Sequence, residues 1–238
     1  MRASPRVAVA DATVAPHLAR RRQRSWLAAG ELALVVSVFI AGSYHLVPLS
    51  KTPFLFIIGW LSLRLRGLRW RDVGLVRPDN WLRMLAIGAA AGMAMELFAL
   101  FVSEPMFARL AGRHPDLSDF RPLVGNLRLL LIVVVPVWLG SALEELVYRG
   151  YFMNRVAGLG RFTPAAWLAS LVLVSAFFGF AHEESQGITG MLQEGFAGLL
   201  LGLLYLASGR TLTVPIVAHG ASNTLAFVLI YFNRYPGV

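Results

Sequence analysis

Long apolar stretches alternate with short polar segments along almost the whole chain. Helix-length stretches occupy about 26–47, 82–102, 127–151, 164–182, 188–207 and 212–232, and a shorter one occupies 53–65. A helix needs roughly 20 apolar residues to cross a bilayer, so the short stretch would have to insert at a tilt or thin the bilayer locally. The pattern predicts an all-α polytopic transmembrane helical bundle of about seven spans (six to eight).

Composition supports a membrane protein. Hydrophobic residues make up 57% of the 238 residues and charged residues 15%, against roughly 45–50% and about 25% in soluble domains. So small a globule could not bury that much apolar surface, which argues against an ordinary soluble enzyme. The sequence contains no cysteine, which excludes disulfides, a thiolate nucleophile and a cysteine-based zinc site.

The formal net charge of +9 is distributed in a way that predicts topology. Basic residues gather in the polar segment 1–24 and in the tryptophan-containing segment 64–81, which favours contact with lipid headgroups over nucleic acid. The N-terminus is therefore expected in the cytoplasm and the C-terminus outside. Lys51 and the mixed segment 104–126 depart from this bias. Arginine-rich, lysine-poor usage favours a bacterial inner (plasma) membrane.

An acidic pair lies inside an apolar stretch, where a charge is costly and needs a reason. Glu145 and Arg149 are one helical turn apart, in the favourable order for an ion pair. Glu144 lies about 100° around the helix from Glu145, so one carboxylate should be paired and the other available. The alternative is that both glutamates bridge Arg149 and a neighbouring helix.

Two further stretches carry polar residues at helical spacing. Phe178 and His182 are four apart, so the phenyl ring can set the direction of the imidazole; a lone histidine there is otherwise typical of the interface. His219 and Asn223 share a face with small residues between them, and could equally be interhelical hydrogen-bonding groups. The remaining stretches hold few such groups, chiefly Glu31, His45, Glu96 and Glu194.

Together these groups form the parts of an amide hydrolase. A carboxylate and a histidine can activate water, while a second histidine and an amide can stabilise an oxyanion. The sequence shows neither a serine nucleophile elbow nor a His-Glu-x-x-His motif. Two other hypotheses remain: a non-catalytic membrane scaffold or immunity-type partner protein, and, less favoured, a proton-coupled transporter.

The depths expected for Glu144, His182 and His219 in the bilayer conflict with a single site shared by the three side chains. At about 1.5 Å per residue, Glu144 and His219 fall roughly 13–16 Å from the inner loops, and His182 falls about 27 Å from the start of its stretch. A common site therefore requires helix tilt, or a fifth span that starts below the membrane plane.

Three motifs in this order resemble the CPBP family, which comprises type II CAAX prenyl endopeptidases and bacterial Abi-like intramembrane proteases: Glu144-Glu145-xxx-Arg149, Phe178-xxx-His182 and His219-xxx-Asn223. The resemblance implies peptide-bond cleavage near the C-terminus of a membrane-anchored or lipidated protein. The resemblance covers about residues 120–235 and implies a CPBP-like catalytic helical core at 120–238. The pattern of charge and apolar residues separately predicts a disordered basic cytoplasmic tail at 1–24 and N-terminal transmembrane helices at 25–119, with an interfacial basic segment at 64–81.

The resemblance also assigns roles. Glu144 and His182 would activate the attacking water, His219 and Asn223 would bind the oxyanion, and Arg149 would hold Glu145. The family has been described both as glutamate-dependent proteases and as metalloproteases. A metal-free mechanism without a cofactor is favoured, although Glu144, His182 and His219 could also bind Zn²⁺ as a His₂Glu site.

Overall fold

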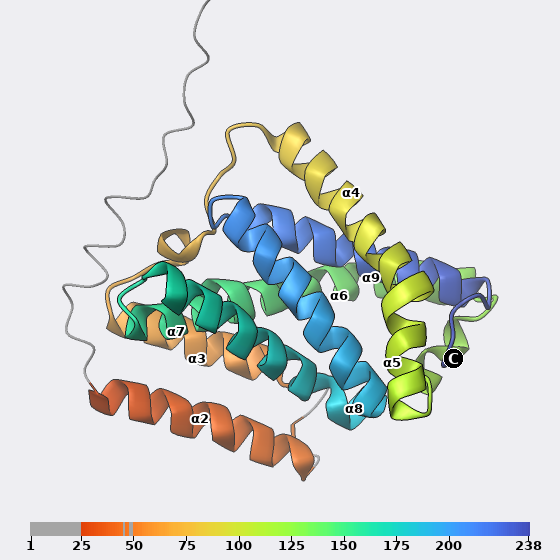
Figure 1. Ribbon diagram of the computed structural model, residues 1–238, viewed down its shortest axis with the longest axis horizontal. Helices are drawn as coiled ribbons and strands as arrows, with labels where there is room; N and C mark the ends of the chain where they lie inside the picture. The colour runs from red at the N-terminus through yellow and green to blue at the C-terminus, as the bar shows by residue number, and fades with distance from the viewer. Residues whose placement is uncertain (1–24, 45, 48–49) are drawn as a thin grey trace, which may run out of the picture.

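The computed structural model describes residues 25–44, 46–47 and 50–238, and within these ranges the chain forms helices and connecting loops with no strand. This confirms the predicted all-α class. The predicted tail at 1–24 and His45 lie outside the described residues. The α-helices, shown in Figure 1, are α2 (Ser25–Ser43), α3 (Thr52–Leu65), α4 (Trp81–Phe98), α5 (Glu104–Ala111), α6 (Leu127–Glu145), α7 (Asn154–Leu159), α8 (Pro164–Ala207) and α9 (Thr213–Tyr231).

Two helices continue beyond their expected ends through π-helical segments. α4 passes through a π-helix at Ala99–Ser103 into α5, and α6 passes through another at Leu146–Met153 into α7. The apolar pattern ends near Glu104 and Asn154, but the protein accommodates both. Glu104 pairs with His114, and the Asn154 amide donates to backbone carbonyls of the preceding turn. The continuous helices are therefore 31 and 33 residues long.

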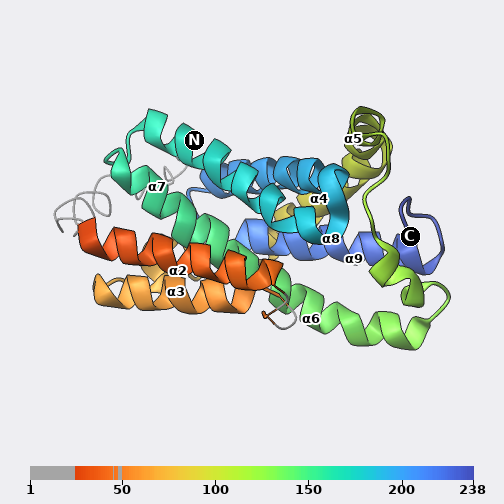
Figure 2. The same ribbon diagram turned by 90° about the horizontal axis from the view of Figure 1, so that it is seen from below.

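α8 contains 44 residues but turns back on itself at Gly187, as both ribbon views show (Figures 1 and 2). Gly187 has φ 69° and ψ −170°, a backbone region essentially restricted to glycine. The first arm (164–186) and the second arm (188–207) correspond to the two stretches that the sequence predicts as separate spans.

Four helices are long and apolar enough to cross a membrane: Trp81–Ala111, Leu127–Leu159, Pro164–Ala207 and Thr213–Tyr231. α8 is counted once among them, although it reverses. Two shorter apolar helices, Leu27–Gly42 and Thr52–Leu65, add to these. The chain is thus an integral membrane helical bundle, and the count of seven spans stays a prediction.

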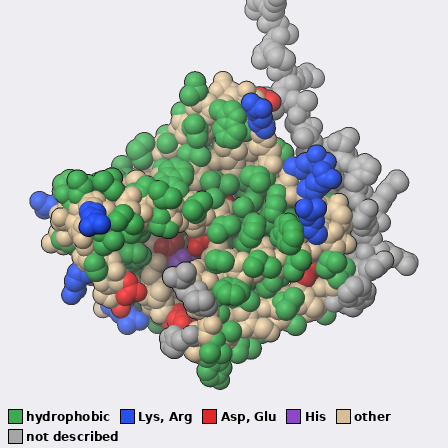
Figure 3. Space-filling model, turned by 180° about the vertical axis from the view of Figure 1, so that it is seen from behind, with side chains coloured by type: hydrophobic (Ala, Val, Ile, Leu, Met, Phe, Trp, Pro, Cys, Tyr) green, Lys and Arg blue, Asp and Glu red, His purple; other side chains and the backbone are tan. Residues whose placement is uncertain are grey.

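The outer surface of the bundle is apolar. Figure 3 shows hydrophobic side chains over most of one face. Leu131, Val135 and Leu139 form a stripe on α6 and are 62–65% exposed. Continuous apolar surface of this kind is unfavourable in water and matches the hydrocarbon of a bilayer.

Inside the bundle, α4 crosses α9 at very short range. A methyl group added at Gly92 would lie 2.1 Å from the carbonyl oxygen of Ala218, and one added at Gly88 would lie 2.7 Å from Cβ of Val217. Glycine at these positions lets the two backbones meet. This crossing places the polar face of α9 toward the interior.

α2 is tied to the bundle by Glu31. Its carboxylate accepts hydrogen bonds from Ser62 on α3, from Arg66 just after α3, and from Arg155 on α7. In the interfacial segment, Trp70 stacks on Phe56 with ring centroids 5.1 Å apart. Glu31, which the sequence shows as an isolated acid in an apolar stretch, therefore has a structural role in holding α2 against the bundle.

Candidate active site

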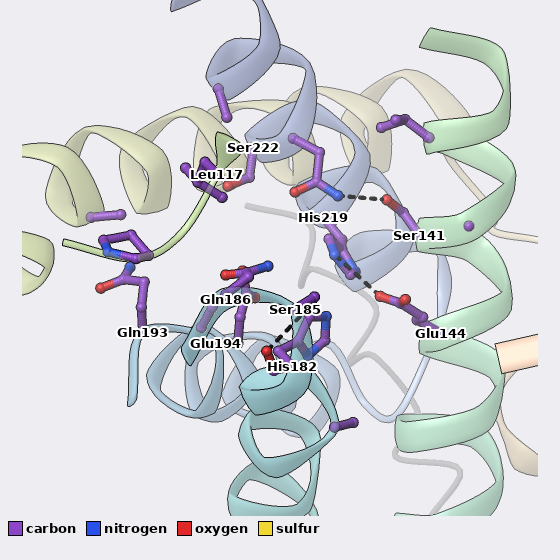
Figure 4. Close-up of a pocket in the computed structure, with 18 of the residues that line it drawn as sticks. Leu117, Ser141, Glu144, His182, Ser185, Gln186, Gln193, Glu194, His219 and Ser222 are labelled. Atoms are coloured by element: carbon purple, nitrogen blue, oxygen red, sulfur yellow. Dashed lines mark hydrogen bonds and ion pairs between the residues drawn. The ribbon is translucent and has the colours of Figure 1, made fainter. Parts of the chain in front are cut away.

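Four of the five predicted catalytic side chains, all except Glu145, line one cavity of about 870 Å³. Glu144 comes from α6, His182 from the first arm of α8, and His219 and Asn223 from α9. In Figure 4, Glu144 and His219 point toward one another, and His182 enters the same space from α8. In Figure 3 acidic and histidine side chains are visible at the bottom of a hollow in the apolar surface.

Glu145 is fully buried and contacts two partners. Its Oε1 accepts a hydrogen bond from Nη1 of Arg149 at 2.8 Å and lies 2.9 Å from Nδ1 of His219. Arg149 also donates to the carbonyl of Gly198 at 2.8 Å, and its guanidinium lies 4.9 Å from the centroid of the Phe178 ring. The structure thus contains the Glu145–Arg149 pair expected from the sequence, and adds His219 to it.

Glu144 is left available by this arrangement. Its side chain is 20% exposed, whereas that of Glu145 is 0% exposed. Oε2 of Glu144 lies 3.7 Å from Nε2 of His219, which is beyond hydrogen-bonding distance, and Oε1 lies 3.4 Å from the hydroxyl of Thr52. One carboxylate is committed to structure and the other faces the cavity.

The orientation of His182 fixes its hydrogen position. Nδ1 lies 2.8 Å from the carbonyl oxygen of Phe178, which can only accept, so Nδ1 carries the hydrogen. Nε2 of the neutral ring is then an acceptor. The Phe178 ring packs against the imidazole with centroids 4.7 Å apart, as the spacing of four residues predicts. His182 therefore offers a basic nitrogen.

Asn223 has a partner that the sequence did not identify. Its Nδ2 donates to Oγ of Ser141 at 3.2 Å (Figure 4). Ser141 precedes Glu145 by four residues and so lies on the same face of α6, which is the signal that could have found it. Thr52 was missed as well, because it begins a helix far from the three motifs in sequence.

A second polar cluster lies on the cavity wall around Glu96 of α4. Its carboxylate accepts hydrogen bonds from Oγ of Ser222 at 2.6 Å and from the hydroxyl of Tyr235 at 2.8 Å. Burial, followed by the charge of Glu96, raises the pKa of Tyr235, which follows α9. The phenol therefore stays protonated and remains a donor to Glu96.

The residues considered for zinc do not fit a three-ligand site as they are arranged. In the described part of the chain, no group of three or more His, Cys, Asp or Glu side chains is placed to hold a metal ion. Nδ1 of His182 lies against the carbonyl of Phe178 and Nδ1 of His219 lies against the carboxylate of Glu145, so Nε2 is the ring nitrogen that each histidine turns toward the cavity.

The depths expected from the sequence are corrected by the helix limits. The helix that carries Glu144 continues to Leu159, so at about 1.5 Å per residue Glu144 lies about 22 Å from its end. This is comparable to the depth of His182 in α8. α9 starts inside the protein, because Leu212 just before it is fully buried and hydrogen-bonded to the carbonyl of Gly74. His219 therefore reaches the same cavity.

Residues 126–225 match the family model described as Type II CAAX prenyl endopeptidase Rce1-like. This part of the chain, less than half of its length, is similar to the type II CAAX prenyl endopeptidases. The Rce1-like segment contains every residue that the sequence assigns to catalysis: Glu144, Glu145, His182, His219 and Asn223. The comparisons with curated proteins and with solved structures return no match.

The match confirms the resemblance seen in the motifs, and the long apolar helices agree with a membrane protein. The CAAX protease family that the chain resembles acts on membrane-anchored protein substrates. The match starts within the predicted core at 120–238. The limits of the predicted regions, and the role of each side chain, stay predictions.

Proposed function

We propose that this chain is an intramembrane endopeptidase that hydrolyses a peptide bond near the C-terminus of a membrane-anchored or lipidated protein. The observation that carries the proposal is that the adjacent acids Glu144 and Glu145 have different surroundings. Glu145 is held by Arg149 and His219, while Glu144 faces the cavity that it shares with His182.

In the proposed reaction, Glu144 and Nε2 of His182 accept hydrogen bonds from one water molecule. As that water attacks the peptide carbonyl carbon, one of these bases takes its proton. The C–N bond then breaks, and the proton passes to the nitrogen of the departing amine. The products are a carboxylate and a new amine, so no other reactant is needed.

Negative charge develops on the carbonyl oxygen during the attack. Asn223 can donate from its amide, and His219 can donate from Nε2 when its ring carries both hydrogens. Ser141 fixes the amide of Asn223, and Glu145 fixes the ring of His219. Glu145, Arg149 and Ser141 are therefore positioning residues in this mechanism.

The decisive experiment compares Glu144→Gln with Glu183→Gln. Both variants remove one carboxylate charge, but Glu183 is exposed at the end of the first arm and does not line the cavity. Termini of membrane proteins are mapped by mass spectrometry in cells that express each form. We expect new C-termini with the wild type and with Glu183→Gln, and their loss with Glu144→Gln.

The same pair of variants tests the alternatives. Cleavage that continues unchanged in Glu144→Gln would exclude the mechanism. A scaffold or immunity-type partner would tolerate the substitution and generate no new termini in any form. A proton-coupled transporter would instead lose pH-dependent flux.

A further inference from the structure

One cation stands apart from the other groups around the cavity. Among the described residues that line it, Lys51 is the one lysine or arginine side chain. Its Nζ lies 2.6 Å from Oε2 of Glu184, and the two side chains are 21% and 41% exposed. Lys51 also departs from the charge bias of the loops, so topology gives no account of it.

Lys51 is placed close to the proposed catalytic acid. The next residue, Thr52, contacts Oε1 of Glu144 at 3.4 Å. The stem of Lys51 packs against Gly42, where an added methyl group would lie 2.3 Å from Cε, and Nζ lies 5.7 Å from the centroid of the Phe39 ring. The ammonium group is thus directed along the rim of the cavity by packing.

Other parts of the cavity wall would repel an anion. Its wall carries acids from α4, α5, the segment before α6 and the second arm of α8, namely Glu96, Glu104, Asp119 and Glu194. Near Lys51 the acid in contact is Glu184, which lies in a partly exposed pair. Such pairs contribute little to stability because water screens them. Another carboxylate can therefore replace Glu184.

We propose that Lys51 binds the free C-terminal carboxylate of the substrate and so sets how far from the terminus the chain is cut. This inference rests on the proposed function, because it assumes that a substrate is cleaved beside Glu144. Each extended residue spans about 3.3–3.6 Å, so a terminus held beside Lys51 leaves room for only a few residues before Glu144. A substrate that lacks the terminal charge would lose this contact.

The test measures binding without cleavage. The probe is a pool of N-palmitoylated decapeptides, randomised at the last five positions and synthesised once as free acids and once as C-terminal amides. The full chain carrying Glu144→Gln is placed in lipid nanodiscs, and the retained peptides are quantified by mass spectrometry. We expect the acid pool to be retained about tenfold more than the amide pool.

Three test variants and one control variant in that background assign the preference to Lys51. Lys51→Met should bring the acid-to-amide ratio to about one, and Lys51→Arg should keep a ratio well above one. Glu184→Gln should raise retention of the acid pool, because it removes the competing carboxylate. Arg64→Met is the matched control: it removes one positive charge from the other end of the same helix, where Arg64 lies over Trp60, and should leave the ratio unchanged.

Equal retention of both pools by the chain with Lys51 intact would overturn the inference. So would a loss of retention in Glu184→Gln that matches the loss in Lys51→Met, since the pair would then be only structural. Failure of the proposed function looks different: the acid preference would be present, but the form with Glu144 intact would generate no new termini.

Discussion

Nδ1 of His219 on α9 lies 2.9 Å from the carboxylate of Glu145 on α6, and the same carboxylate oxygen receives the guanidinium of Arg149. One buried acid therefore connects two helices and orients a proposed catalytic ring. Removing one member of a buried ion pair leaves an uncompensated charge, which typically costs about 3–5 kcal/mol.

Glu145→Gln should therefore lower both stability and cleavage. We expect a melting temperature in detergent several degrees below that of the wild type, whereas Glu144→Gln should melt close to it. The double variant Glu145→Leu/Arg149→Met replaces the pair by apolar groups and should regain most of the melting temperature but stay inactive. A wild-type melting curve for Glu145→Gln would contradict this account of the pair.

Ser141→Ala should reduce the cleavage rate more than the stability. The serine hydroxyl accepts the hydrogen bond that holds Asn223, and such a bond is worth about 1 kcal/mol. We expect kcat to fall about tenfold, with KM changed little, because Asn223 acts on the developing oxyanion. In the double variant Ser141→Ala/Asn223→Ala, the serine change should add almost nothing to the loss of kcat caused by Asn223→Ala. Fully additive losses would show that the two residues act independently.

Gly92→Ala should disrupt the crossing of α4 and α9. The new methyl group would lie 2.1 Å from a backbone oxygen, and overpacking of this kind costs about 1–3 kcal/mol. Gly30→Ala is the control, because an added methyl group there meets nothing within 4 Å. Thermal unfolding in detergent should separate the two variants, and equal melting temperatures would show that the helices can move apart freely.

Topology can be measured cleanly because the sequence contains no cysteine. Ser50 and Arg161 are exposed residues of the α2–α3 and α7–α8 connections, which lie at opposite ends of the bundle (Figures 1 and 2). Each is replaced by cysteine, as Ser50→Cys and Arg161→Cys. With the N-terminus in the cytoplasm, a membrane-impermeant maleimide should label Ser50→Cys in intact bacterial cells and Arg161→Cys only after permeabilisation. The reverse pattern would invert the predicted orientation.

Much of the fold was predictable because apolar length and periodicity act locally. The predicted stretches at 53–65 and 212–232 agree closely with α3 (Thr52–Leu65) and α9 (Thr213–Tyr231). The π-helical continuation of α6 was not predictable, since it depends on polar groups such as Asn154 finding partners in three dimensions.

The site was predictable only as separate motifs. Spacing along one helix predicted the pair of Glu145 with Arg149 and the contact of Phe178 with His182, which are local. The contacts of His219 with Glu145, of Asn223 with Ser141 and of Thr52 with Glu144 join distant segments, so no local pattern encodes them.

The reversal at Gly187 links a remote backbone angle to the position of His182, a proposed catalytic residue. His182 lies five residues before it, in an arm whose height within the bundle depends on where the chain folds back. A bulkier residue at position 187 should displace the His182 imidazole along the axis of its helix relative to Glu144. Neither side chain would itself be changed. Loss of turnover in such a variant would result from misalignment of His182 and Glu144. A mutational screen that takes every inactive variant to mark a catalytic residue would therefore wrongly include Gly187.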